Sequence, residues 1–156
     1  GYSVMLKDLA TTKAIVQMVL DQLHKNHNIK FNIINTNVVV LDHTSGFGQV
    51  PYCALQLSPE KREADRHLNV CIIHQPIGQT DDGVILGTYV RRLGVSLVSR
   101  PINDITFANI LLHEIGHFLG ADHSNSGIMV ANMPEVSGER LLRFDRQSIK
   151  EIRNSQ

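Results

Sequence analysis

The sequence predicts a mixed α/β fold of the α+β class. Apolar residues recur at helical spacing at Ile15, Val19 and Leu23. By contrast, Val70–Ile73 is a short apolar run rich in β-branched residues, which is typical of a buried strand. A second helical pattern lies closer to the C-terminus, and strand patterns lie between the two. The 156 residues are enough for one domain, residues 1–156, with a core of its own.

The first quarter of the chain predicts a strand, a helix and a second strand. Ser3–Leu6 is short and partly apolar, so we expect a first strand there. Thr11 or Thr12 can cap an amphipathic helix that ends near Lys25. Phe31–Leu41 is rich in β-branched residues and predicts one long strand.

The next segment contains turn residues before the strand pattern returns. Asp42–Tyr52 holds glycines and a proline, so we expect a loop. Ser58 can cap a short helix over Pro59–Arg66, because proline is favoured at the first helical position. Asn69–His74 predicts a strand, and Gln75–Gly83 predicts a loop.

Two strands then lead to the second long helix. We expect strands over Val84–Val90 and Gly94–Val98, and Pro101 ends the latter. Asn103 or Asp104 can cap the helix that follows. Its apolar positions are Ile110, Leu111, Ile115 and Phe118.

The last part of the chain predicts an irregular segment and a closing helix. After Met129 we expect an irregular segment that extends to Gly138. Asp145 can then cap a final helix that places Ile149 and Ile152 on one face.

Charge and hydropathy exclude some partners, and the cysteines permit one crosslink. Lys and Arg total 15, as do Asp and Glu, so we expect no nucleic-acid partner. No apolar run approaches the roughly 18 residues of a membrane span. Cys53 and Cys71 can form one disulfide, or Cys71 can remain a small apolar residue of a buried strand.

One stretch carries the pattern of a catalytic zinc site. His113 and His117 are four residues apart, so on a helix they face one ion from successive turns. Gly120 can end the helix in the left-handed conformation and let the chain turn, so that His123 supplies a third nitrogen. Three protein ligands leave one tetrahedral position open, which is typical of catalytic zinc. Glu114 lies beside the metal and can take a proton from water.

These residues resemble the H-E-x-x-H-x-x-G-x-x-H signature of the metzincin metallopeptidases at every fixed position. Met129, in Ser126-Gly127-Ile128-Met129, is similar to the family's Met-turn. The resemblance implies a mixed twisted sheet with an edge strand over the active-site cleft, a zinc-bearing helix, a Met-turn and a C-terminal helix. Ser124 resembles the matrix metalloproteinase branch, whereas Gly-Ile-Met is closer to the adamalysin branch.

The resemblance also implies an activity. The chain is expected to be a secreted, monomeric zinc endopeptidase that hydrolyses peptide bonds of proteins, with Glu114 as general base toward a zinc-activated water. It lacks the upstream histidine and aspartate pattern of a structural zinc site, so one catalytic ion is expected. The alternatives are a catalytically silent zinc-containing binding module and a hydrolase of a non-peptide amide.

Six residues are expected to bind substrate, again by resemblance. An extended peptide would pair with the edge strand at Val84, Leu86 and Thr88. The pocket for the residue beyond the cleaved bond would be lined by three apolar residues: Val130, Met133 and Pro134. Calcium remains open, because the acidic pair Asp81-Asp82 beside a glycine is more often a solvated turn. The five other histidines lack ligand spacing and receive no role.

Overall fold

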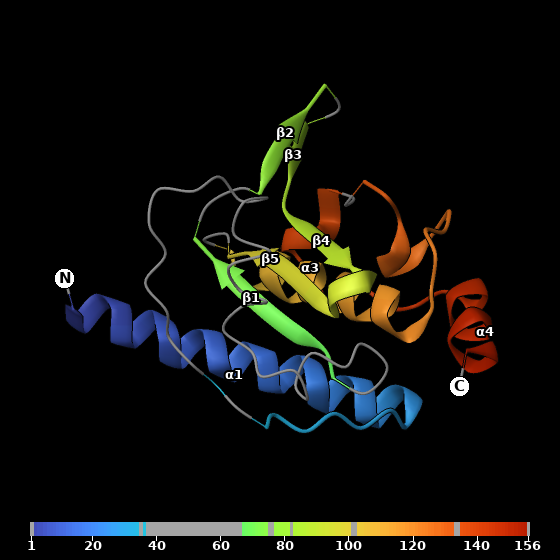
Figure 1. Cartoon of the computed structure of the whole chain (residues 1–156), viewed down its shortest axis with the longest axis horizontal. Helices are drawn as coiled ribbons and strands as arrows, with labels where there is room; N and C mark the ends of the chain where they lie inside the picture. The colour runs from blue at the N-terminus through green and yellow to red at the C-terminus, as the bar shows by residue number, and fades with distance from the viewer. Residues whose placement is uncertain are drawn as a thin grey trace. The chain divides into compact units, whose positions relative to one another are not determined.

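The computed structural model of the chain describes residues 2–34, 36, 67–74, 77–81, 83–100, 103–132 and 135–155 (Figure 1). The chain divides into two compact units, Gly1–Val40 and Leu41–Gln156. The loop predicted at 42–52 and the short helix predicted at 59–66 lie outside the described residues. None of the described helices is long and apolar enough to cross a bilayer.

The first unit contains one long helix, α1, from Tyr2 to His27. The strand predicted at Ser3–Leu6 is wrong, because those residues form the first turns of α1. The cap predicted at Thr11 or Thr12 is wrong for the same reason, since both residues lie inside the helix. No glycine or proline occurs within α1, so nothing in the sequence interrupts it before Asn28. Asn28 has a φ of 55° and donates its amide to the carbonyl of His24 at 2.9 Å, which ends the helix. Residues 31–34 have no regular secondary structure, so the described start of the predicted strand at Phe31–Leu41 is wrong too.

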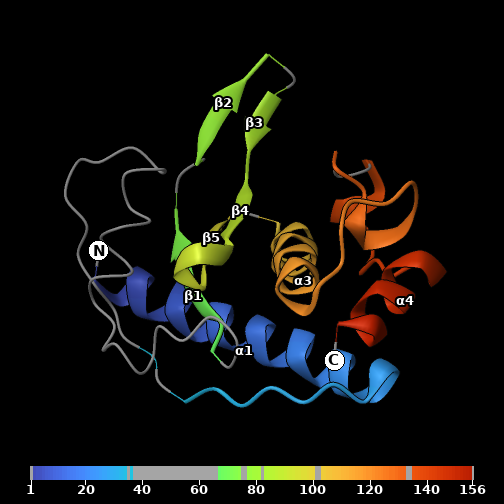
Figure 2. The same ribbon diagram turned by 45° about the vertical axis from the view of Figure 1, so that its right-hand side comes forward.

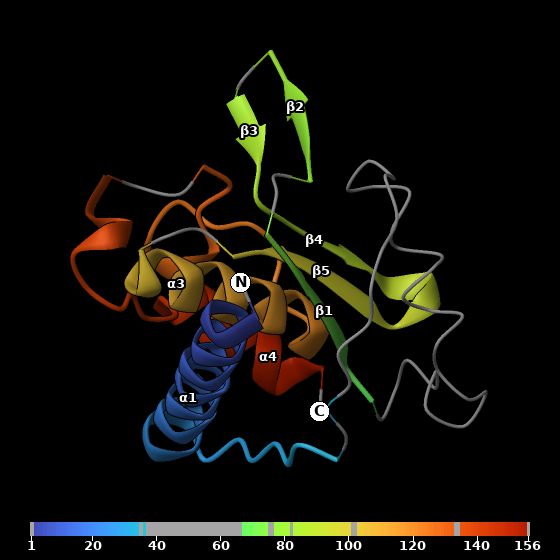
Figure 3. The same ribbon diagram turned by 90° about the vertical axis from the view of Figure 1, so that its left-hand side faces the viewer.

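The second unit is built on a three-stranded sheet in the order β1-β5-β4 (Figure 3). β1 (Asn69–Ile73) runs parallel to β5 (Val95–Ser99), and β4 (Gly87–Val90) runs antiparallel to β5. All five residues of β5 are buried, which is consistent with its central place. The predicted strands at 69–74 and 94–98 are confirmed within about one residue.

A two-stranded hairpin precedes β4 along the chain. β2 (Gly78–Thr80) pairs with β3 (Gly83–Ile85), and the hairpin projects from the three-stranded sheet (Figures 1 and 2). The predicted loop at 75–83 is therefore wrong for these strand residues. The strand predicted at Val84–Val90 is split at Leu86, because β3 pairs with β2 whereas β4 pairs with β5. The carbonyl of Leu86 still accepts the amide of Ser99 at 2.8 Å.

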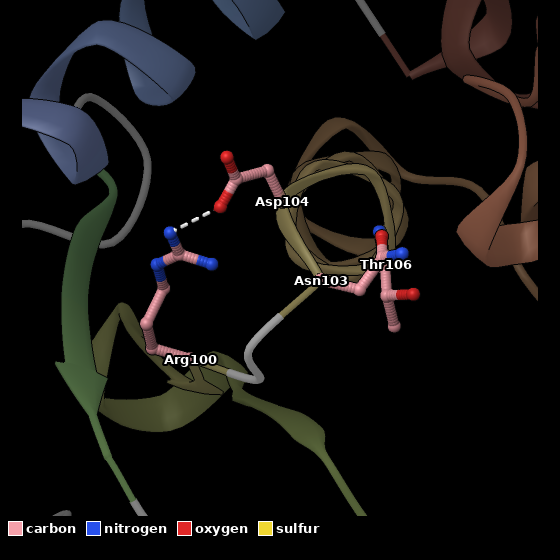
Figure 4. Close-up of polar contacts among 4 residues, drawn as sticks. All are labelled: Arg100, Asn103, Asp104 and Thr106. Atoms are coloured by element: carbon pink, nitrogen blue, oxygen red, sulfur yellow. Dashed lines mark hydrogen bonds and ion pairs between the residues drawn. The ribbon is translucent and has the colours of Figure 1, made fainter.

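The helix predicted before the histidines is confirmed as α3, Asp104–Leu119. Its N-cap is Asn103, whose side chain accepts the amide of Thr106 at 2.9 Å. Arg100 pairs with Asp104 at 2.5 Å (Figure 4), and its guanidinium lies 4.8 Å from the ring centre of Phe107. These contacts fix the start of α3 at the end of β5. α3 lies beside β4 and β5 (Figure 2), and most of its apolar residues are buried.

Three short elements follow α3. The 3-10 turn η3 (Gly127–Met129) covers the predicted Met-turn stretch, and a second 3-10 turn, η4 (Glu135–Gly138), lies in the segment after it that was predicted to be irregular. The closing helix is confirmed as α4, Arg146–Asn154, with Asp145 as N-cap. A further 3-10 turn, η2 (Arg91–Leu93), joins β4 to β5. The mixture of helices and a small mixed sheet agrees with the predicted α+β class.

Asn109 connects α3 to the segment between η4 and α4. Its side chain is fully buried, and its Nδ2 donates to the carbonyls of Ser137 at 2.7 Å and Arg140 at 2.9 Å. Its Oδ1 accepts the amide of Leu142 at 2.8 Å. A single amide side chain thus satisfies three backbone groups, two of which lie on the chain between η4 and α4.

Candidate metal centre

Three histidine nitrogens converge where α3 ends. Nε2 of His117 lies 3.2 Å from Nε2 of His113 and 3.2 Å from Nε2 of His123. One ligand atom from each residue lies within 4.8 Å of the other two. Two nitrogens bound to zinc at about 2.0–2.1 Å in tetrahedral geometry are about 3.3 Å apart. The two separations of 3.2 Å are close to that value, and the predicted ligand set is brought together as expected.

Local structure explains how the ligands meet. His113 and His117 lie one turn apart on α3, and Gly120 ends that helix with a φ of 107°. The amide of Gly120 donates to the carbonyl of His117, and the amide of Ala121 donates to that of Gly116. This left-handed cap turns the chain back toward His123.

Backbone carbonyls select the tautomer of two ligands. Nδ1–H of His113 donates to the carbonyl of Ile128 at 2.7 Å, and Nδ1–H of His117 donates to the carbonyl of Ala121 at 2.9 Å. In a neutral imidazole the other nitrogen then carries the lone pair, so each Nε2 is ready to bind a metal. Burial also lowers the pKa of His113 to about 4 and lowers the pKa of His117. Both rings are therefore neutral near pH 7, as metal binding requires.

Glu114 lies against the sheet beside the ligands. The residue is only 4% exposed, and its Oε2 is buried without a hydrogen-bond partner among the residues that the structure describes. A Cβ added at Gly87 would lie 2.8 Å from Oε1, so the carboxylate faces the backbone of β4 at the position where that strand carries no side chain. Desolvation by burial raises the pKa of Glu114 to about 8 in the metal-free site.

The carboxylate and the three nitrogens form a coherent donor set. A buried carboxylate without a partner is costly unless a positive charge lies nearby. Three neutral imidazoles suit zinc and other transition metals. A cation held by the histidines would favour the ionised form of Glu114 and lower its pKa. The residues present thus fit a bound divalent metal.

Met129, the residue of the predicted Met-turn, packs against α3. Met129 is fully buried in η3, and a Cβ added at Gly116 would overlap its Sδ and would lie 2.8 Å from a ring carbon of Phe144. α3 therefore approaches η3 at a residue without a side chain. The carbonyl of Ile128, next to Met129, is the acceptor that orients His113.

The predicted substrate residues fall partly within the described chain. Val84 lies in β3, Leu86 lies between β3 and β4, and Thr88 lies in β4. Among the described strands, β4 pairs with β5 alone, so it is an edge of its sheet. Only Thr88 is thus on that edge strand. Val130 follows η3 and is half-buried, whereas Met133 and Pro134 lie outside the described residues.

None of the other predicted metal or cysteine sites is part of the described metal centre. Within the described ranges, the three histidines form the one group of His, Cys, Asp or Glu side chains that can hold a metal. Asp81 is exposed, and Asp82 lies outside the described residues. Cys71 is disulfide-bonded, and Cys53, the other cysteine of the chain, is not among the described residues.

The comparisons with known proteins add no relative. No model of a known family matches the chain, and no curated protein matches it. The functional interpretation therefore depends on the residues and on their geometry.

Sequence reasoning missed three residues that shape the centre. These are Gly87, which leaves room for Glu114; Gly116, which admits Met129; and Asp145, which does more than cap α4. Asp145 accepts hydrogen bonds from the hydroxyls of Ser124 and Ser126. A signal for the two glycines exists, because small residues often mark close approaches of backbone to another element. The sequence carries no signal for the contact of Asp145 with Ser124 and Ser126.

Proposed function

We propose that the chain is a zinc-dependent endopeptidase of the metzincin type. The observation that carries the proposal is the convergence of three Nε2 atoms beside the buried Glu114, whose Oε2 has no hydrogen-bond partner among the described residues. Structural zinc sites normally use four protein ligands, whereas three ligands with an adjacent acid are typical of hydrolytic centres.

His113, His117 and His123 would hold the ion. When bound, the ion supplies Lewis-acid chemistry, which polarises a carbonyl and lowers the pKa of water. The carbonyls of Ile128 and Ala121 keep Nε2 of the first two histidines unprotonated.

Glu114 would move the proton. Its Oε2 has no partner within the described structure and can accept a proton from water. The same oxygen can return that proton to the leaving amine. Burial excludes competing solvent and strengthens the electrostatic interactions of the carboxylate.

The edge strand supports a peptide rather than a small amide as substrate. β4 lies directly beside Glu114, and a strand edge offers backbone amides and carbonyls to an extended chain. We also propose an extracellular location, because a disulfide at Cys71 fits an oxidising compartment.

A peptide-library assay with and without a zinc chelator tests the activity. Glu114→Gln should retain near-stoichiometric zinc and a normal melting temperature but lose cleavage by at least the ~10² to 10⁴ usual for one acid-base group. His123→Ala should instead lose zinc affinity, because two nitrogens remain on the ion. Full cleavage by Glu114→Gln, or full zinc occupancy in His123→Ala, would refute the assignment. Zinc binding without cleavage of any peptide would favour the binding module.

A further inference from the structure

The three ligands are not held in the same way. His113 and His117 belong to α3, and each donates its Nδ1–H to a backbone carbonyl. His123 is exposed and follows the end of α3, and among the described residues no acceptor binds its Nδ1. Hydrogen bonds to the second ring nitrogen normally orient a ligand histidine. Among the described residues, the restraint on the position of His123 comes from the backbone that follows it.

The backbone after His123 is attached to the N-terminus of α4. The hydroxyls of Ser124 and Ser126 both donate to Oδ2 of Asp145, the latter at 2.9 Å. The amide of Ser124 also donates to the carbonyl of Met129 at 2.9 Å. Residues 124–126, which we call the ligand loop, are thus held by one carboxylate oxygen and by η3.

The same residue caps the helix with its other oxygen. Oδ1 of Asp145 accepts the amide of Ser148 at 2.8 Å. The cap and the contact with the ligand loop therefore use different atoms, so substitutions can separate them.

We propose that Asp145 is a positioning residue for the metal centre, which holds the ligand loop and thereby sets the contribution of His123 to metal affinity. This inference rests on the proposed metal site. A histidine that is fixed before the ion arrives loses less conformational freedom on binding than one on a free loop.

The electrostatics of Asp145 favour this role. Partial burial raises its pKa, but hydrogen bonds from Ser124, Ser148 and Ser126 outweigh that effect and lower the pKa to about 2. Asp145 is therefore ionised near neutral pH, and hydrogen bonds to an ionised acceptor are stronger than neutral ones.

A matched set of variants isolates the contact. Ser124→Ala/Ser126→Ala removes both donors and leaves the cap on Ser148 intact. Ser124→Thr keeps a hydroxyl at the same position. Asn125→Ala is the control, because Asn125 is exposed in the same loop between the two serines.

The measurement is the zinc dissociation constant by competition with a chromophoric chelator, together with the melting temperature of the metal-free protein. The double variant should bind zinc about 10- to 100-fold more weakly, which is the range typical for the loss of a group that orients a metal ligand. Its metal-free melting temperature should stay within a few degrees of wild type. Ser124→Thr and Asn125→Ala should bind zinc like wild type, and excess zinc should restore peptide cleavage to the double variant.

Two results would overturn the inference. Unchanged zinc affinity in the double variant would show that His123 does not depend on the contact. Weaker affinity that is matched by a large loss of metal-free stability would show a general structural role instead. If wild-type protein bound no zinc, the proposed function itself would fail, and this result is distinguishable because it does not involve the variants.

Discussion

Replacing Gly87 by alanine should damage catalysis while leaving the metal in place. An alanine Cβ would lie 2.8 Å from Oε1 and 3.2 Å from Cδ of Glu114, and 3.0 Å from Cγ2 of Ile110. Ordinary contacts begin near 3.4 Å, so the carboxylate has to move by about half an ångström or β4 has to move away. Gly87 is not among the positive-φ glycines, so the effect comes from space and not from backbone strain.

The size of the effect follows from this displacement. Misplacing a catalytic group by about 1 Å can cost about 10²-fold in rate, so we expect kcat to fall by about 10- to 100-fold. Overpacking costs about 1–3 kcal/mol of unfolding free energy, which corresponds to a fall in melting temperature of about 3–10 °C for a chain of this size. Zinc affinity should hold, because the three atoms nearest to the added methyl group belong to Glu114 and Ile110 and not to a ligand.

Steady-state kinetics, zinc titration and thermal unfolding on the Gly87→Ala variant check these expectations separately. Unchanged kcat with zinc bound would refute the reasoning, since the methyl group would then have displaced nothing that the reaction needs. Loss of zinc in parallel with activity would also refute it, because the perturbation would have reached the ligands.

Three further changes test other contacts. Proline at Leu86 or Thr88 should reduce peptide turnover more than zinc content, because the change disturbs the strand edge and spares the ligands; equal loss of both would mean misfolding. Asn109→Leu should cost roughly 3–5 kcal/mol by denaturant unfolding, because three backbone groups lose their partner, whereas Asn103→Ala should cost about 1 kcal/mol as a lost cap. Equal losses of unfolding free energy in the two variants would contradict the conclusion that Asn109 satisfies three backbone groups. In metal-free protein, Asp145 should stabilise the fold fully above about pH 4, and this contribution should disappear as pH falls toward 2, because its folded pKa is depressed to about 2. Asp145→Asn keeps a cap but does not titrate, so the difference in unfolding free energy between this variant and wild type should shrink as pH falls from about 4 toward 2. A difference that stays constant with pH would argue against an ionised Asp145.

The fold was predictable wherever a local signal decided the structure. Asn103, Gly120 and Asp145 are strong helix-boundary residues, and each lies at the predicted boundary. Ser3–Leu6 had no such signal, and its brief apolar pattern suits a strand or a helix equally. The break at Leu86 depends on which strand pairs with which, and periodicity along one strand carries no information about its partner.

The candidate site divides in the same way. Spacing on one helix and the cap that ends it predict the convergence of three ligands: His113, His117 and His123. The sequence alone was therefore enough to predict this part of the site. Gly87 and Asp145 act on residues that are 27 and about 20 positions away, since they face Glu114 and the ligand loop. Such contacts depend on the tertiary fold, and no pattern within either segment predicts them.

The close approach at Gly116 has a consequence for protein engineering. Between Glu114 and His117 the signature leaves two positions unspecified, Ile115 and Gly116, yet here one is a core residue at 2% exposure and the other admits Met129 and Phe144. Copying the two histidines and the glutamate onto a foreign helix would reproduce the ligands without this recess. The graft would then lack the neighbour whose carbonyl, on Ile128, orients His113. A transplantable unit has to include η3, so the smallest portable centre spans at least residues 113–129.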